Sequence, residues 1–191
     1  MNPLPDSQHL TLLYSRTQIL KRVTELAKAI SADHPERGFV VVAVLNGAVV
    51  FLADLLRALR QDVRLGFVRV SSYGTSAESS GLPVIQIPND LPLAGEDVLI
   101  VEDILDTGLS MTLLCESIQA RSPASLRICV LIDKRQRRLH TVKPDYVGFE
   151  LSSGFVVGYG MDYAERYRSL PEIFSVDIED PECDSDDGPA H

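Results

Sequence analysis

The sequence predicts an α/β domain built on a mostly parallel β-sheet flanked by helices. Short apolar runs rich in Val and Ile occur at 38–45, 98–101 and 126–132, with no alternation of polar residues. This is the pattern of strands that are buried on both faces. The segments that follow the first two runs place apolar residues at helical spacing instead. Strands that are buried on both faces and alternate with helices are typical of parallel sheets.

An amphipathic helix comes first along the chain. Ser15 and Gln18 have the spacing of a capping box, in which each residue hydrogen-bonds the backbone of the other. The helix is expected to end near His34 and Pro35. Its apolar positions are Ile19, Val23, Leu26, Ala27 and Ile30.

A strand–helix–strand unit follows. The run 38–45 is predicted to be a strand that Asn46 and Gly47 terminate, and the segments 48–59 and 63–73 read as a helix and a second strand. The apolar positions are Val50, Leu52, Leu55, Leu56 and Leu59 in the helix, and Val63, Leu65, Phe67 and Val70 in the strand.

The later elements repeat this alternation. The Ser- and Gly-rich segment 71–81 is too polar to pack and is predicted to be a mobile loop, long enough to serve as a lid. A strand at 98–101 and a helix at 112–120 come next. The remaining strands are expected at 126–132, 145–150 and 155–160.

Length and charge indicate one domain over residues 1–176 and an acidic, disordered tail over 177–191. A chain of 191 residues can bury a full core. The net charge is −9, but with the seven acids of the tail set apart the body carries about −2, so no nucleic-acid-binding face is expected. Those acids are Asp177, Glu179, Asp180, Glu182, Asp184, Asp186 and Asp187.

Other features indicate a cytoplasmic protein. The first ten residues lack a basic cluster and an apolar core, and no apolar run is long enough for a membrane span, so no membrane partner is expected. Cys115, Cys129 and Cys183 have neither disulfide nor zinc spacing.

The stretch VLIVEDILDTGLS, residues 98–110, carries the chemistry. Two acids, Glu102 and Asp103, follow a buried strand at the end where α/β sheets bind ligands. Thr107, Gly108 and Ser110 come where a helix begins, so hydroxyls and backbone amides can converge on a phosphate. Acids that bind a diol beside a phosphate loop suggest a ribose 5-phosphate. The alternative is a helix cap and a turn with no ligand.

This stretch resembles the phosphoribosyl-pyrophosphate motif of the type I phosphoribosyltransferases through its full length. Downstream, DYVGFE and FVVGYGMDYAERYRSLP are similar to the C-terminal signature of the hypoxanthine-guanine phosphoribosyltransferases. With LNGAVVFLADL, the likeness spans roughly residues 10–174. It implies the type I fold, with a small hood made by the N- and C-terminal segments, and a homodimer or homotetramer.

The resemblance implies a role for individual residues in binding the donor. Glu102 and Asp103 contact the ribose hydroxyls directly or through Mg²⁺, and Asp162 is a further acid linked to magnesium. Arg168 contacts pyrophosphate, and Asn46 and Gly47 form the pyrophosphate loop, where the family commonly has a cis peptide. The 5-phosphate loop consists of Thr107, Gly108 and Ser110 with the Asp106 and Leu109 backbone, and Ser72 and Tyr73 close over the ribose.

For the purine base, the resemblance matches Asp106 to the acid near N7 that moves a proton. Lys134 donates to O6, which favours a 6-oxopurine over adenine. Phe155 stacks on the ring, and the Val156 backbone addresses its edge. Without the resemblance, Lys134 would be read as part of a solvated basic run and Phe155 as core.

Two positions depart from the family pattern. Asn46 stands where Lys or Arg is usual, so a cation near pyrophosphate is missing. Ser152, Ser153 and Gly154 replace a more polar loop before Phe155.

Three functions fit the sequence to different degrees. The favoured one is magnesium-dependent transfer of phosphoribosyl to N9 of hypoxanthine or guanine, giving IMP or GMP, with xanthine an open choice. A non-catalytic regulator that senses nucleotides or binds RNA would keep the fold but needs a basic surface. A response-regulator-like receiver would explain Asp103 but not Lys134, Phe155 and Arg168 together.

Overall fold

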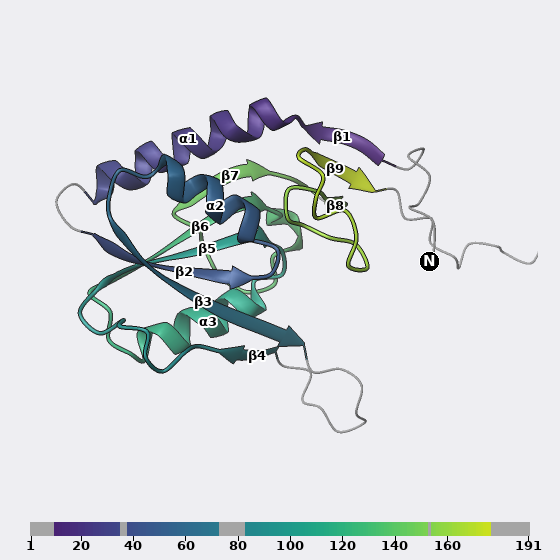
Figure 1. Ribbon diagram of the computed structural model, residues 1–191. Coiled ribbons are helices and arrows are strands. Elements are labelled where there is room, and N and C mark those ends of the chain that lie inside the picture. The colour runs from purple at the N-terminus through teal and green to yellow at the C-terminus, as the bar shows by residue number, and fades with distance from the viewer. Residues whose placement is uncertain (1–9, 35–37, 73–82, 153, 177–191) are drawn as a thin grey trace, which may run out of the picture.

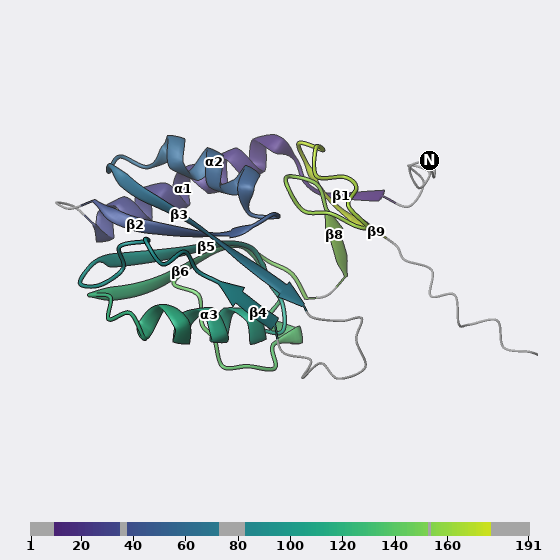
Figure 2. The same cartoon turned by 60° about the horizontal axis from the view of Figure 1, so that its bottom comes forward.

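The computed structural model describes residues 10–34, 38–72, 83–152 and 154–176. Their largest unit is a six-stranded sheet in the order β4-β3-β2-β5-β6-β7, parallel throughout except for β4. Two helices cover one face and a third helix covers the other (Figures 1 and 2). The strands of this sheet are β2 (Phe39–Leu45), β3 (Val63–Ser72), β4 (Pro83–Gln86), β5 (Asp97–Leu105), β6 (Ser125–Asp133) and β7 (Tyr146–Glu150).

Helix α1 (Arg16–Asp33) has the predicted start and the predicted buried face. The Ser15 side chain accepts a hydrogen bond from the Gln18 amide, and the Gln18 side chain accepts one from the Ser15 amide, so the capping box is complete. All five predicted apolar residues are buried. Together with α2 (Val49–Ala58), this helix packs on the odd-numbered residues of β2, β5 and β6.

The central strands are buried on both faces, as their continuous apolar runs predict. Residues 39–44 of β2 and 98–101 of β5 are all buried, because α1 and α2 cover one face and α3 (Leu109–Gln119) covers the other. Strand β5 extends to Leu105, four residues past the predicted end. Glu102 and Asp103 therefore belong to the strand and inherit its fixed backbone geometry.

Strand β3 lies near one border of the sheet, and one of its faces has little cover. Its buried positions are Gly66 and Val68, which face α3 and the segment before β5. Leu65 and Phe67 point to the opposite face and are 39% and 40% exposed. The alternation of apolar and polar residues in 63–70 predicted the strand correctly. It does not tell how much of this face of β3 is covered by α2.

A small antiparallel sheet forms the predicted hood. It pairs β1 (Leu10–Tyr14) and β8 (Phe155–Val157) with β9 (Ile173–Val176), so residues from the two ends of the chain meet. Figure 1 shows this sheet beyond the carboxyl ends of the large sheet. It is therefore placed over the edge where the predicted site lies.

Several sequence predictions fall outside the described residues. They include Tyr73 and nearly all of the predicted lid loop, Ser153, and the acidic tail 177–191. None of the helices in the described segments combines the length and the apolar character that a membrane crossing requires.

Candidate active site at the carboxyl edge of the sheet

The strand order creates a crevice between β2 and β5. From β2 the chain continues to its neighbour β3 on one side, whereas β5 and β6 extend the sheet on the other side. In open parallel sheets, ligands bind outside the carboxyl ends of the strands at such a reversal. The two loops predicted to bind the donor, after β2 and after β5, are therefore neighbours in space although more than fifty residues separate them.

A pocket of about 270 Å³ lies at this crevice. It brings together the end of β2, the last part of β5 and the start of α3, which are the segments that the sequence singled out. The residues that line it are Val44, Leu45, Val70, Glu102, Ile104, Leu105, Asp106, Thr107, Gly108, Ser110 and Met111.

The predicted phosphate loop is the tight turn that joins β5 to α3. Gly108 has a φ of 89°, a left-handed conformation that favours glycine, and the Cβ of a larger residue would meet the Arg138 side chain at 2.9 Å. Among the described residues no side chain caps α3, so the amides of its first turn are open to a ligand. The turn therefore has the geometry of an anion site at a helix N-terminus.

Glu102 and Asp103 are adjacent acids whose side chains are partly buried. Burial, repulsion from Asp103 and a hydrogen bond between the two side chains hold the pKa of Glu102 well above its usual range. Burial also raises the pKa of Asp103, although hydrogen bonds from Glu102 and from backbone amides, and the charge of Arg168, oppose the rise. Two carboxyl groups so placed favour a cation or hydroxyl donors as partners.

The Asn46–Gly47 turn lies against the same acids. The Leu45–Asn46 peptide is cis, as the resemblance implies. A Cβ at Gly47 would lie 1.9 Å from Oδ2 of Asp103, so only glycine fits beside this carboxylate. On the other side, a Cβ at Gly160 would lie 2.4 Å from the Gly47 carbonyl oxygen, which shows how closely the hood approaches this turn.

The residues predicted to bind a purine come together from three elements. Asp106 follows β5, Lys134 follows β6, and Phe155 begins β8. Lys134 Nζ lies 3.7 Å from Oδ2 of Asp106 and 5.9 Å from the centre of the Phe155 ring. Phe155 is 51% exposed and so offers a free face for stacking, whereas Val156 is buried.

Lys134 is a buried residue rather than a member of a solvated basic run. It is 4% exposed, and its amide donates to the Leu105 carbonyl at 3.0 Å. Burial lowers its pKa, while the neighbouring Asp106 carboxylate opposes that effect.

Asp162 and Arg168 form an ion pair on the hood side of the site. Arg168 Nη2 lies 2.8 Å from Asp162 Oδ1, and its Nη1 donates to the Gly160 carbonyl at 3.0 Å. Since Gly160 packs against Gly47, this pair is held next to the predicted pyrophosphate loop. In the described part of the chain, no three His, Cys, Asp or Glu side chains are grouped so as to enclose a metal ion.

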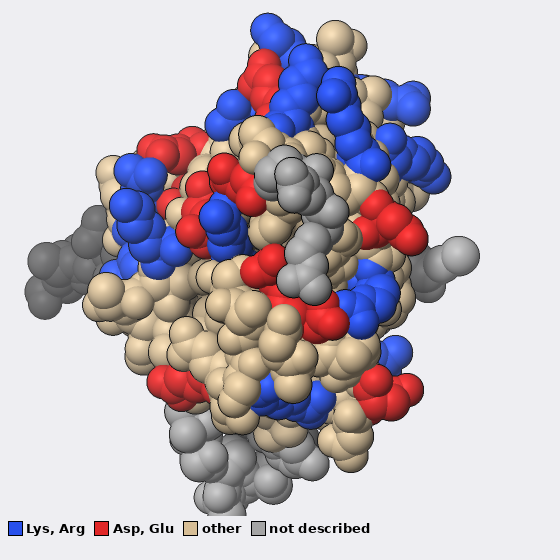
Figure 3. All heavy atoms as spheres, turned by 90° about the vertical axis from the view of Figure 1, so that its left-hand side faces the viewer, with Lys and Arg blue, Asp and Glu red and all other residues tan. Residues whose placement is uncertain are grey.

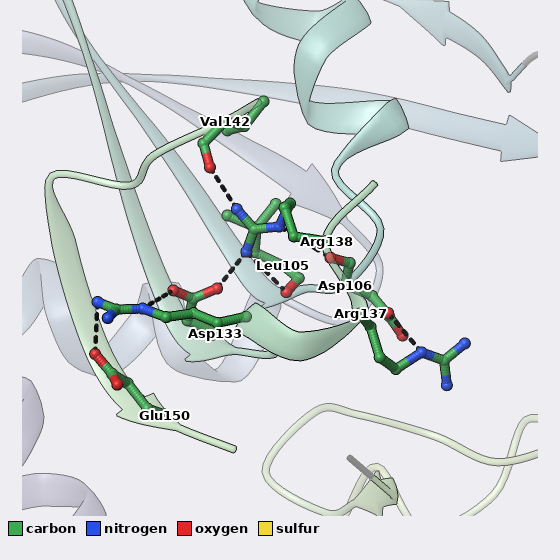
Figure 4. A network of polar contacts seen from close by, with 8 residues as sticks. Leu105, Asp106, Asp133, Arg137, Arg138, Val142 and Glu150 are labelled. Carbon is green, nitrogen blue, oxygen red and sulfur yellow. Dashed lines mark hydrogen bonds and ion pairs between the residues drawn. The ribbon is translucent and has the colours of Figure 1, made fainter. Parts of the chain in front are cut away.

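The sequence analysis missed two arginines that contact the loop after β5, Arg137 and Arg138 (Figure 4). Arg138 donates to the carbonyls of Asp106 and Val142 at 3.0 and 2.5 Å and pairs with the buried Asp133. Arg137 Nε lies 3.0 Å from Oδ1 of Asp106. In the sequence both belong to one basic run, 134–138, and their closeness to Lys134 is the signal that points to the site.

Comparison with known proteins identifies the family of the chain. The family described as the phosphoribosyl transferase domain matches residues 9–164. The hypoxanthine-guanine phosphoribosyltransferase of Aquifex aeolicus is 44% identical over 169 residues, which are 88% of this chain and 95% of that protein. The enzyme of the same name from Bacillus subtilis is 42% identical over 162 residues, which cover 85% of this chain and 90% of that protein.

Solved structures give the same result. A crystal structure of a hypoxanthine-guanine phosphoribosyltransferase from Bacillus anthracis superimposes with a TM-score of 0.82 and 40% identity, over 88% of this chain and 99% of that chain. The hypoxanthine phosphoribosyltransferase of Trypanosoma cruzi has a TM-score of 0.82 and 37% identity, over 91% and 94% of the two chains. The chain therefore belongs to the hypoxanthine-guanine phosphoribosyltransferase family.

Proposed function

We propose that the residues at the carboxyl edge carry out the reaction of this family, purine salvage by phosphoribosyl transfer. The enzyme moves 5-phosphoribosyl from phosphoribosyl pyrophosphate to N9 of hypoxanthine or guanine, giving IMP or GMP and releasing pyrophosphate. The observation that carries the assignment of residues is the meeting of Asp106, Lys134 and Phe155 beside the phosphate loop. One side of the site fits a purine and the other a phosphorylated ribose.

The donor binds along the crevice between β2 and β5. The amides and hydroxyls of the loop from Asp106 to Ser110 receive the 5-phosphate, because they form the open N-terminus of α3. Glu102 and Asp103 face the ribose hydroxyls. Arg168 and the amides of the Asn46–Gly47 turn bind the pyrophosphate. The backbone amides thus replace part of the favourable interaction with pyrophosphate that a Lys or Arg at position 46 would provide.

The acids of this site fit Mg²⁺. Glu102 and Asp103 are neighbouring carboxyl groups, and burial raises the pKa of both, so a bound cation would stabilise their charged forms. These two acids would hold the ion while substrate oxygens complete its coordination, as magnesium prefers. Asp162, the third acid that the resemblance implies, is not grouped with them in the described part of the chain. The bound ion would neutralise charge on the pyrophosphate leaving group.

The purine lies between the Phe155 ring and the end of β5. Lys134 donates to O6, and an ammonium cannot accept the 6-amino hydrogens of adenine, which gives the preference for 6-oxopurines. Asp106 faces N7 and handles its proton, and the Val156 backbone addresses the edge of the ring. The phosphate, ribose and base sites hold the two substrates next to each other, and the reaction is accelerated by this positioning and by charge stabilisation.

We expect a homodimer or homotetramer in the cytoplasm. Leu65 and Phe67 on β3 leave an apolar face 39% and 40% exposed, and Val49 at the start of α2 is 45% exposed. A second copy of the chain is the partner that this surface suits. Sedimentation equilibrium of the protein and of Phe67→Ser measures the mass of the assembly, and an unchanged mass would exclude this face as the contact.

The decisive experiment offers several bases to the purified protein. Hypoxanthine, guanine, xanthine, adenine and uracil are each incubated with Mg²⁺ and phosphoribosyl pyrophosphate, and the nucleotides are separated by chromatography. We expect IMP and GMP, and a product from xanthine would widen the substrate range. Asp106→Asn should lower kcat by 10²- to 10⁴-fold, the usual contribution of a positioned proton-transfer group, while the donor still binds. Absence of any nucleotide although the donor binds would exclude the transferase.

A further inference from the structure

The carboxylate of Asp106 is held between two cations. Its Oδ2 lies 3.7 Å from Lys134 Nζ, and its Oδ1 lies 3.0 Å from Nε of Arg137. Lys134 is buried, whereas the Arg137 side chain is 46% exposed and approaches from the rim of the site. Figure 4 shows Arg137 directed at Asp106 from the turn that follows β6. Each oxygen of the carboxylate therefore has its own cation.

The two contacts differ in what happens to them when a purine binds. Lys134 is the group proposed to donate to O6, and its distance of 3.7 Å from Asp106 is too long for a strong hydrogen bond. Once its ammonium turns to the base, it restrains Asp106 less. Arg137 has no such second task in the proposed site, and its ion pair with Oδ1, the shorter of the two contacts, leaves Oδ2 as the oxygen nearer to Lys134.

The three arginines of this turn contact different groups. Arg138 is the structural one, since it is largely buried and binds the carbonyls of Leu105, Asp106 and Val142. Arg135 points away, toward Asp133 at 3.2 Å and Glu150 at 2.6 Å. Among these three, Arg137 is the arginine whose side chain pairs with the Asp106 carboxylate.

We infer that Arg137 is a positioning residue, which orients the Asp106 carboxylate so that Oδ2 faces N7 of the purine. This inference rests on the proposed function. Without Arg137 the carboxylate is free to rotate, and part of its population points away from the base. The main effect falls on the use of the base, because among the described residues the Arg137 side chain pairs with the Asp106 carboxylate and not with the hydroxyls of the phosphate loop or with Glu102 and Asp103.

The test is a double-mutant cycle with Arg137→Gln and Asp106→Asn. We expect Arg137→Gln to lower kcat/KM for hypoxanthine about tenfold, which is less than loss of the acid itself but more than loss of an exposed ion pair. The KM for phosphoribosyl pyrophosphate should change less than twofold. In the Asp106→Asn background the same substitution should have almost no further effect, because the group that it orients is gone.

Two further variants separate positioning from stability. Arg137→Lys keeps a cation near Oδ1 and should recover most of the lost activity. Arg135→Gln removes an equal charge from the same turn without touching Asp106 and should behave as the unaltered enzyme. Thermal unfolding of each variant shows whether it is folded. If Arg137→Gln does not fold, Arg137→Lys is compared with the unaltered enzyme instead.

A binding measurement tests whether the Asp106 carboxylate contacts N7 of the purine. The preference for hypoxanthine over 7-deazahypoxanthine, obtained from KM and from the inhibition constant of the analogue, should fall several-fold in Arg137→Gln and return in Arg137→Lys. Equal losses for Arg137→Gln in both backgrounds, or equal effects of Arg137→Gln and Arg135→Gln, would overturn the inference while the transferase activity stands. If the unaltered enzyme makes no nucleotide, or Asp106→Asn is fully active, the inference falls together with the proposed role of Asp106.

Discussion

The two edges of the large sheet differ in how the charged residues nearest the strand ends are compensated. At the amino edge, where the strands begin, acids and bases are paired. Arg64 lies 2.5 Å from Glu96, and Asp33 accepts hydrogen bonds from Arg127 at 2.5 Å and from Tyr146 at 2.6 Å. Figure 3 views the molecule from this side and shows Lys and Arg next to Asp and Glu in several places on a largely uncharged surface.

The carboxyl edge lacks this compensation at its centre. Glu102 and Asp103 are two acids side by side, with raised pKa values, and Gly47 presses on one of them. The amides that begin α3 have no side-chain cap among the described residues. Neighbouring acids with raised pKa values, beside helix amides without a side-chain cap, are typical of a site whose ligand supplies further partners.

Pocket size alone would have indicated the wrong edge. A hollow of about 440 Å³ lies at the amino edge, lined in part by Asp62, Arg64 and Glu96, and it is larger than the 270 Å³ pocket beside the phosphate loop. Its Arg64 and Glu96 side chains are already paired with each other. The difference teaches that unsatisfied chemistry identifies the functional edge better than volume does.

The comparison predicts that glycines at the two edges have different tasks. Gly47→Ala should lower kcat/KM for phosphoribosyl pyrophosphate by roughly 100-fold or more, because a Cβ placed 1.9 Å from Asp103 Oδ2 must displace the acid that we propose to bind the donor. Steady-state kinetics with varied donor measures this effect.

Gly95 provides the matched control at the amino edge. It has a φ of 72°, with open space where a Cβ would be. Gly95→Ala should therefore cost about 1 kcal/mol of folding free energy through backbone strain and leave kcat/KM unchanged. Similar activity losses in both variants would contradict the assignment of function to one edge.

The charged groups of the two edges should also differ in their response to pH. Burial lowers the pKa of Lys134 below its ordinary 10.5, so its ammonium is lost as pH rises through that lowered value. We expect kcat/KM for hypoxanthine to fall several-fold as pH rises, at pH values below 10.5, where a free lysine would still be protonated. Kinetics between pH 6 and 10 at saturating donor measures this limb.

The sign of the matching stability effect follows from proton binding. Between the lowered pKa of Lys134 and 10.5 the unfolded chain binds more protons than the folded chain, so the contribution of Lys134 to folding stability rises with pH there. At the amino edge the hydrogen bond with Tyr146 raises the pKa of Arg127 further, so Arg127 keeps its charge in this range. A loss of activity that coincided with unfolding would contradict the role of Lys134.

The smallest effect is expected at the amino edge. Tyr146→Phe removes a hydroxyl that is bonded to Asp33 and Arg127 at 2.6 Å each, while the ring stays in the core. We expect a loss of about 1 kcal/mol in the free energy of unfolding, since the Asp33–Arg127 pair remains. Urea unfolding measures the loss, and the kinetic constants should not change. A change in KM for either substrate would show that the two edges are coupled.

Local patterns in the sequence were sufficient for most of the fold. The capping box of Ser15 and Gln18, the buried runs of β2, β5 and β6, and the loop from Asp106 to Ser110 depend on neighbouring residues, whose spacing is visible in the chain. Strands β1, β4 and β9 were not predicted individually, because strands of only four or five residues are defined by the partners that they pair with.

The sequence by itself determined the fold class, the phosphate loop and, through its resemblance to the family, the residues expected around the purine. Only the tertiary structure decided that Lys134 is buried, that Gly47 contacts Asp103, that Leu65 and Phe67 are exposed, and that Arg137 pairs with Asp106. Hydrogen-bonding patterns and helical spacing act between near neighbours, so they can be read along the chain. Burial and ion pairing depend on which distant segments meet at the end of a strand, and that is fixed only when the sheet and its hood assemble.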